Sequence, residues 1–466
     1  RASLPKLARL PTSASAFSPR PQEPGDYEHG VAPPIERLPL PLQADSVAGR
    51  IEDPAGYDEE GPPDGLTLDD SIRRLVESNR DLRIKALELP QADADILTAG
   101  LRDNPLLFYG SDDVAYGSYS PDRPGEVEHG ISLVLPVDYM GKRERRVALA
   151  EEEKRVLVAQ YQDAVRVAID ELYTAYVNAL IARQSLRAAE DSLVLIDDVI
   201  AAFRSRHSET STDQEREQFD DLTVERGVTD MALQDARDRY DTARHQLADL
   251  LEIPPTSVES MELRGKINVP CPPLPSLESL IATAKERRPD LVAHRLGIAR
   301  ARAEWEEERS ERFSDAYFLF TPMNYLDRSQ SHERSVNTWG AGVFVTLPLF
   351  NRNQGNVRRS EINIVQSRIE SDVLEDQAED EVRHAYTNLT HSREDIIRLE
   401  KETLPAVRRK RDKAKARLEA GQIHTEDFLK VERQTTSLVR FYRDTAARNR
   451  RNMLRLNTAV GCRLLP

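Results

Sequence analysis

Apolar residues recur with a strict alternation of three and four positions between residues 158 and 203. The members of this seam are Val158, Tyr161, Val165, Ala168, Leu172, Ala175, Ala179, Ala182, Leu186, Ala189, Leu193, Ile196, Ile200 and Phe203. No proline lies between Pro136 and Pro254, so the spacing predicts one helix over about 142–206. At 1.5 Å per residue it would be roughly 100 Å long. A second apolar row predicts two neighbouring helices. Its members are Ile169, Tyr173, Tyr176 and Leu180.

A shorter helix is predicted over about 214–252. Its seam runs from Phe219 to Leu250 with the same spacing, and a proline pair at 254–255 ends it. The polar residues 207–213 separate it from the long helix. The two helices are therefore expected to pair as an antiparallel hairpin.

The segment before the long helix predicts a helix and two strands. Thr67 can cap a helix over about 66–102, which Asn104-Pro105 ends. Apolar runs bounded by turn residues predict strands at 106–119 and 127–137.

The same order of elements is predicted a second time after residue 273. The second set comprises a helix over 276–313, strands over 316–326 and 338–349, a long helix over about 356–419 and a final helix ending near Val460. An offset of 209 residues carries Phe219 to Phe428 and Leu247 to Leu456, so the two halves read as copies. The fold class is mainly α with a small β part. The predicted division is a proline-rich arm over 1–65, repeats over 66–255 and 274–462, a linker over 256–273 and a tail over 463–466.

Composition agrees with long solvated helices. The chain is 39% hydrophobic, 31% charged and only 6% aromatic, and its net charge of −15 argues against a nucleic-acid partner. No run of about 18 apolar residues exists, which excludes a transmembrane helix and leaves a membrane β-barrel open.

Each half supplies one pair of strands of about ten residues, the length that crosses a bilayer when tilted. Four strands cannot close a barrel, and an open sheet edge in lipid leaves backbone amides unpaired. Several copies must therefore share one barrel, and a homotrimer would supply twelve strands. Polar residues at Asp112, Asp113 and Asn324 weaken the lipid-facing pattern of these strands.

Over roughly residues 66–462 the chain resembles the TolC-type outer-membrane efflux family. The residues that carry the resemblance are Leu135-Pro136 with Gly141-Lys142-Arg143, Leu347-Pro348-Leu349-Phe350-Asn351-Arg352-Asn353-Gln354-Gly355-Asn356, and Leu418-Glu419-Ala420-Gly421. The second string and Gly-Lys-Arg look most like the heavy-metal, cobalt-zinc-cadmium branch.

The resemblance implies a homotrimeric channel: a 12-stranded β-barrel in the outer membrane, continuous with an α-helical barrel that crosses the periplasm. Its expected partners are outer-membrane lipid, a periplasmic adaptor and an inner-membrane pump. The expected cargo is metal cations or small toxic molecules, and no enzymatic activity or cofactor is expected. A periplasmic adaptor or a soluble coiled-coil scaffold is the alternative, although an adaptor would have one hairpin and a scaffold no strands.

Two candidate sites lie at the predicted helical turns. Acidic residues there would form a cation-attracting ring if several copies meet, and a solvated loop is the alternative. They are Glu209, Asp213, Asp220, Asp221, Glu426 and Asp427. Docking of an adaptor is predicted at the second turn, where glycine permits a tight left-handed turn, and an ordinary helix cap explains the glycine equally well. That segment is Glu419, Ala420, Gly421 and Gln422.

The remaining candidate chemistry is sparse. Cys271 and Cys462 could form a disulfide, with two free thiols as the alternative. His384 and His391 lie seven residues apart on one helical face and are interpreted as exposed histidines rather than metal ligands. The sequence shows no phosphate-binding loop, paired-histidine metal motif or nucleophile elbow.

Overall fold

The structure is a computed structural model of the chain. It describes residues 60–112, 127–206, 213–269, 272–313, 315–328, 333–420, 422–423 and 425–465. The predicted proline-rich arm therefore lies outside the described residues, apart from its last six positions, 60–65. The polar turn predicted at 207–213 lies outside them too, apart from Asp213.

The elements follow the predicted duplicated order. The first half contains α1 (Leu68–Ser78), α2 (Arg80–Ala99), β1 (Leu106–Asp112), β2 (Val127–Val137), α3 (Lys142–Arg206) and α4 (Asp213–Leu250). After the short α5 (Pro255–Val258), the second half contains α6 (Leu277–Arg287), α7 (Pro289–Ser310), β3 (Ala316–Asp327), β4 (Val336–Val345), α8 (Gln354–Arg398), the π-helical turn η3 (Leu399–Thr403), α9 (Leu404–Glu419) and α10 (Thr425–Val460). Among the described residues, no helix is both long enough and apolar enough to cross a membrane.

The leading helix of each half is broken, which corrects the prediction of single helices over 66–102 and 276–313. Asn79 adopts an extended conformation, caps α2 by accepting the Leu82 amide, and donates its side-chain amide to Leu250. Arg288 is extended as well, because Pro289 disfavours helical geometry in the residue before it. The predicted cap Thr67 is confirmed, since its hydroxyl accepts the Asp70 amide at 3.1 Å.

Two further boundaries differ from the prediction. The strand predicted to reach residue 349 ends at Val345. The long helix predicted over 356–419 contains η3, where the Leu404 amide reaches back five residues to the Leu399 carbonyl. Pro405 follows at once and has no amide to donate, which explains why the regular α-helical ladder is interrupted there.

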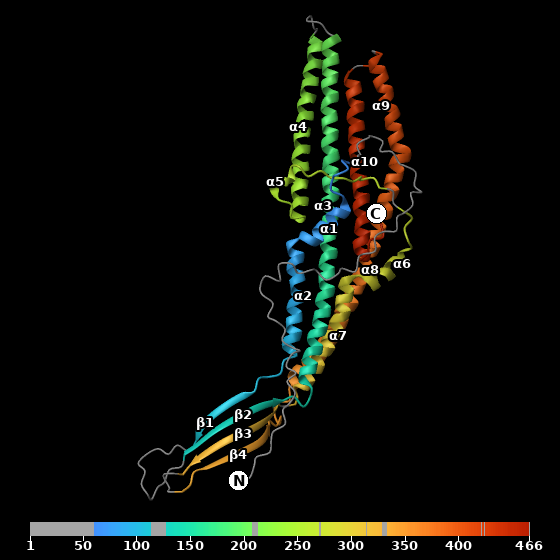
Figure 1. Cartoon of the computed structure of the whole chain (residues 1–466). Helices are drawn as coiled ribbons and strands as arrows, with labels where there is room; N and C mark the ends of the chain where they lie inside the picture. Colours follow the sequence, from blue (N-terminus) through green and yellow to red (C-terminus); the bar gives the residue numbers. More distant parts are fainter. Residues whose placement is uncertain are drawn as a thin grey trace. The chain divides into compact units, whose positions relative to one another are not determined.

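The four strands form one antiparallel sheet in the order β1-β2-β3-β4. Each strand is continued by a helix: α2 leads into β1, β2 into α3, α7 into β3 and β4 into α8. These helices keep the order of the strands, since α2 packs on α3, α3 on α7 and α7 on α8 (Figure 1). Sheet and helices therefore form one continuous layer.

Beyond α2 and α7 the layer is continued by the two hairpins. The helix α4 packs along α3, while α10 packs on α3, α8 and α9 (Figure 1). One border of the layer is therefore formed by β1, α2 and α4, and the other by β4, α8 and α9.

The main hydrophobic core surrounds the middle of α3, as the seam predicted. Both predicted rows are buried there, including Leu172 at 0% and Leu180 at 1% exposure. The hydroxyl of Tyr176 shares a hydrogen bond between the carbonyl oxygens of Leu66 (3.1 Å) and Arg264 (2.6 Å). The guanidinium of buried Arg183 donates to carbonyl groups of the same linker. Polar bonds to backbone thus hold the linker against α3.

Substituting Gly461 with alanine should destabilise the fold by about 2 kcal/mol or more. Gly461 has φ of +80°, and an added Cβ would lie 2.9 Å from the Cα of Arg288. Gly297 within α7 is the matched control, because no atom lies within 4 Å of an added Cβ. Gly297→Ala should keep or raise stability by up to about 1 kcal/mol. Denaturant unfolding of the purified protein measures both changes, and equal stability of Gly461→Ala and the unchanged protein would contradict the packing described here.

Candidate functional site

One face of the sheet is apolar over most of its length, and Ser111, His129 and Asn337 share it toward the end of the strands remote from the helices. The strand register places on it Leu107, Tyr109, Ile131, Leu133, Leu135, Phe318, Phe320, Met323, Trp339, Ala341 and Val343. Trp339 and Val343 expose 74% and 70% of their surface in a single copy. An apolar surface of this extent needs a non-aqueous neighbour.

The opposite face mixes small and polar residues with apolar ones such as Phe108, Val134, Leu319 and Phe344. It includes Glu128, Gly130, Ser132, Thr321, Asn324, Thr338, Gly340 and Gly342. The hydroxyl groups of Ser132 and Thr321 are hydrogen-bonded at 2.9 Å, and the Asn324 amide donates to Glu128. Strands with one apolar and one polar face are typical of a layer between lipid and water.

A β-bulge accounts for the polar residue that seemed to interrupt the third strand. The register shifts between Thr321 and Asn324, so the extra residue of β3 turns Asn324 to the polar face. Asp112 pairs with Glu128 and shares that face. Neither of these two polar residues therefore lies on the largely apolar face.

Both borders of the layer expose groups that a second copy could satisfy. The outer backbone edges of β1 and β4 have no neighbouring strand in the described sheet. Next to β1, the helix α2 exposes Ile84 and Leu97 by 61% and 59%. Next to β4, the helix α8 exposes an apolar row at helical spacing, Ile362, Val365, Ile369 and Val373, each by about half.

Of the predicted acidic residues, those on the described parts of α4 and α10 lie at the end of the helices remote from the sheet (Figure 1). Asp213 begins α4 and pairs with Arg216 at 3.6 Å, while Asp220 and Asp221 are exposed on the next turns. Asp427 lies at the start of α10 and pairs with Lys430 at 3.6 Å. Glu209 and the side chain of Glu426 lie outside the described residues. A ring formed by these residues stays a prediction.

A groove of about 320 Å³ separates α3, α4 and α10 near the same end. Ile196, Val199 and Leu429 give it an apolar floor, and Glu225 pairs with Arg433 across it. The hydrogen bonds that the Arg433 guanidinium donates to the Glu225 carboxylate raise the pKa of Arg433. The sequence analysis missed this link between the two hairpins, because its partners are 208 residues apart and carry no local signal.

The segment predicted to dock an adaptor closes α9. The Gln422 amide donates to the Arg417 carbonyl at 2.8 Å, and the Ala420 amide donates to Ala416 at 3.0 Å. Such bonds are typical of a helix that ends in a left-handed residue. Gly421 and the side chain of Glu419 lie outside the described residues. Helix capping therefore has direct support, and docking stays a prediction.

His384 and His391 are both exposed, as the sequence analysis interpreted them, whereas the proposed disulfide is not tested. Cys462 is buried in the cluster of α6, α8 and α10, and burial raises the pKa of its thiol. Cys271 lies outside the described residues, so the disulfide stays a prediction. His391 lines a polar cavity of about 410 Å³. Among the described residues, no three or more His, Cys, Asp or Glu side chains gather to hold a metal.

A family model described as outer membrane efflux protein matches residues 71–251 and 280–459. The chain belongs to the outer membrane efflux protein family. This membership confirms the resemblance and places the protein in the cell outer membrane, extending into the periplasm. The matched segments cover most of both halves and leave out residues 252–279 between them.

Two relatives in the family carry metal-resistance or membrane descriptions. The chain is 24% identical over 295 residues to the cobalt-zinc-cadmium resistance protein CzcC of Cupriavidus metallidurans, covering 63% of this chain and 65% of that protein. It is 24% identical over 360 residues to SilC of Salmonella typhimurium, a probable outer membrane lipoprotein, covering 72% and 74%.

Solved structures share the fold. The chain superimposes on CusC with a TM-score of 0.67 and 18% identity over 93% of this chain and 99% of that one. It superimposes on the MtrE outer membrane channel of Neisseria gonorrhoeae with a TM-score of 0.66 and 16% identity over 93% and 98%. The predicted TolC-type fold, mainly α with a small sheet, is thereby confirmed.

Placing a charge on the apolar face of β4 should prevent stable insertion. Ala341→Arg puts a guanidinium where the register places lipid, at a cost of about 2–4 kcal/mol near the bilayer midplane. Thr338→Arg on the same strand points to the polar face and should fold normally. Folding yield in phospholipid vesicles, read by heat-modifiable electrophoresis, measures the difference. Equal yields of the two variants would contradict the assignment of the faces.

Proposed function

We propose that the chain is one protomer of a homotrimeric outer-membrane channel, the exit duct of a tripartite efflux system. It would work with a periplasmic adaptor and an inner-membrane pump, and would conduct passively without chemistry of its own. The observation that carries the proposal is the sheet with one largely apolar face, an opposite face on which the polar side chains of its middle gather, and two open edges. A soluble scaffold or adaptor would have no use for such a sheet.

The number of copies follows from strand arithmetic. Each copy contributes four strands, so two copies would close an eight-stranded barrel. An interior of that size is filled by side chains or a single small ligand, whereas a larger barrel can hold an aqueous lumen. Three copies give twelve strands, and the helices that continue the strands would form a second ring in register with them. The apolar rows on α2 and α8 are suited to seal neighbouring copies.

Metal cations are the proposed cargo, with small toxic molecules as the broader class. Asp220, Asp221 and Asp427 lie at the end of the helices remote from the sheet, and a threefold assembly would triple their charge. A ring of carboxylates concentrates cations and repels anions. The description of CzcC as a cobalt-zinc-cadmium resistance protein supports the same cargo.

An adaptor is proposed to dock at the hairpin tip formed by Glu419, Ala420, Gly421 and Gln422. The closing bonds of α9 support a compact turn that can project between neighbouring helices. The groove beside Glu225 and Arg433 would offer a second helix a place at the same end.

The purified protein should conduct ions in planar lipid bilayers with preference for cations. Changing Asp220, Asp221 and Asp427 together to asparagine should lower the cation-to-anion permeability ratio by about two-fold or more, and less at high salt. Asp238→Asn is the matched control, because Asp238 is equally exposed on α4 but remote from the tip. Absence of conductance would contradict the channel, and an unchanged ratio would contradict the acidic ring.

A further inference from the structure

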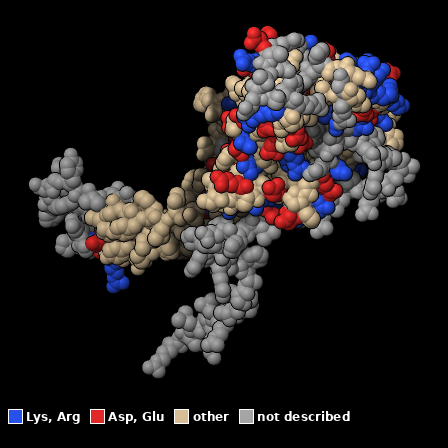
Figure 2. All heavy atoms as spheres, turned by 90° about the horizontal axis from the view of Figure 1, so that it is seen from above, with Lys and Arg blue, Asp and Glu red and all other residues tan. Residues whose placement is uncertain are grey.

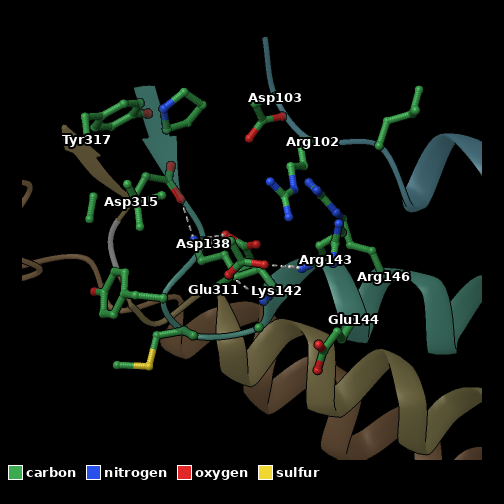
Figure 3. A pocket seen from close by; sticks show the side chains of 17 residues that line it. Arg102, Asp103, Asp138, Lys142, Arg143, Glu144, Arg146, Glu311, Asp315 and Tyr317 are labelled. Carbon is green, nitrogen blue, oxygen red and sulfur yellow. Dashed lines mark hydrogen bonds and ion pairs between the residues drawn. The ribbon is translucent and has the colours of Figure 1, made fainter. Parts of the chain in front are cut away.

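A cavity of about 590 Å³ lies where the strands become helices (Figure 3). Three connections enclose it: the one from α2 to β1, the one from β2 to α3, and the one from α7 to β3. The strands β2 and β3, whose ends line it, have 11 and 12 residues, a length that spans the hydrocarbon thickness of a membrane when tilted. On the proposed function, the cavity therefore lies at the level of lipid headgroups.

Three arginines line this cavity. Arg102 follows α2, whereas Arg143 and Arg146 lie on the first turns of α3. Their guanidinium groups gather on one side of the cavity in Figure 3. Within the described ranges, none of these side chains takes part in a hydrogen bond or ion pair, and the Nε of Arg146 is buried without an acceptor. A buried donor without a partner costs about 1–3 kcal/mol, which applies to the Nε of Arg146, whereas Arg102 is exposed and Arg143 half-buried. An anion entering the cavity would give all three guanidinium groups an acceptor.

The other charges of the cavity are already engaged. Lys142 donates to Glu311 at 3.0 Å and Asp315 at 2.8 Å. Burial lowers the pKa of Lys142, but these two bonds outweigh it and leave the pKa raised. Asp138 accepts the backbone amides of Lys142 and Arg143, and thereby caps α3. The free backbone amides at the start of α3 thus already donate to the carboxylate of Asp138. The three arginine side chains are the cationic groups of the cavity that are left to bind an anion.

Two further carboxylates line the cavity, Asp103 and Glu144. Glu144 lies 3.7 Å from the Cβ position of Gly141, and Figure 3 shows it pointing away from the arginines. Burial raises the pKa of Glu307, and the positive charge of Arg146 lowers it by less, so that the pKa stays raised. The three guanidinium groups are therefore not neutralised by a paired carboxylate of the described chain.

The second half has a left-handed residue at the equivalent position but lacks this cluster. An offset of 212 residues carries Gly141 to Asn353, and both adopt the left-handed conformation, with φ of +69° and +56°. The same offset replaces Lys142 and Arg143 by uncharged residues, Gln354 and Gly355. It carries Arg146 to Arg358, which pairs with Glu361 at 2.8 Å. The cluster of unpaired arginines is therefore confined to the first half.

We propose that Arg102, Arg143 and Arg146 form a binding site for a phosphate group at the junction of sheet and helices. Guanidinium groups bind phosphate oxygens through paired, charge-assisted hydrogen bonds, and three of them can surround one tetrahedral anion. A phospholipid headgroup and free inorganic phosphate share this chemistry. The headgroup source rests on the proposed membrane placement, whereas the phosphate chemistry does not.

The test compares the full protein with the triple variant Arg102→Gln, Arg143→Gln, Arg146→Gln. Delipidated protein is titrated with inorganic phosphate by calorimetry. In parallel it is incubated with phosphatidylglycerol vesicles, repurified and examined by native mass spectrometry for retained lipid. The triple variant should lose at least about ten-fold in affinity for the probe that binds. Arg358→Gln, the second-half counterpart, should bind as the unchanged protein does.

Each outcome decides the proposal. Retained lipid without phosphate affinity assigns the site to a headgroup, and phosphate affinity alone assigns it to the free anion. Equal binding by the unchanged protein and the triple variant in both arms overturns the site. Arg143→Lys is the control for misfolding of the triple variant, because it keeps the positive charge but loses the paired hydrogen bonds of a guanidinium. It should bind with intermediate affinity. A variant that conducts normally yet binds no phosphate separates this site from the channel proposal.

Discussion

The structure depends on one requirement: backbone amides at the edges of the sheet must find hydrogen-bond partners. A single copy pairs β1 with β2, β2 with β3 and β3 with β4, and leaves the outer edges of β1 and β4 open. In lipid, each unpaired group would cost several kcal/mol. In the proposed assembly, closure between copies would remove that cost, and the helices, which follow the lateral order of the strands, would close with them.

The helix α3 continues β2 and runs to the end of the helices remote from the sheet, so it connects the sheet to both hairpins. Its alanine-rich seam lets α7, α10 and α4 approach closely, and its buried Tyr176 donates a hydrogen bond to the linker backbone at Arg264. Small residues at a helix interface favour regular long-range packing over a bulky core. The linker between the two halves is therefore held against α3, the helix of the first half on which α7 and α10 of the second half also pack.

Sequence periodicity predicted the long elements well because their stability is local and repetitive. The bounds of α3 match the prediction, and both apolar rows are buried. The sequence analysis missed the breaks at Asn79 and Arg288. A single extended residue between two helices leaves the helical spacing of the apolar residues on either side unchanged. The bulge in β3 and the Glu225–Arg433 pair were missed because they arise from pairing between distant segments. Of the cavity arginines, only Arg143 lay in a recognised motif.

Hydrogen exchange of the edge strands tests the central claim most directly. In the protein assembled in lipid nanodiscs, the amides of β1 and β4 should be protected as strongly as those of β2 and β3, because neighbouring copies supply their partners. Peptide-resolved mass spectrometry distinguishes the four strands. Rapid exchange confined to β1 and β4, with β2 and β3 protected, would show that the edges stay open and would contradict a barrel shared between copies.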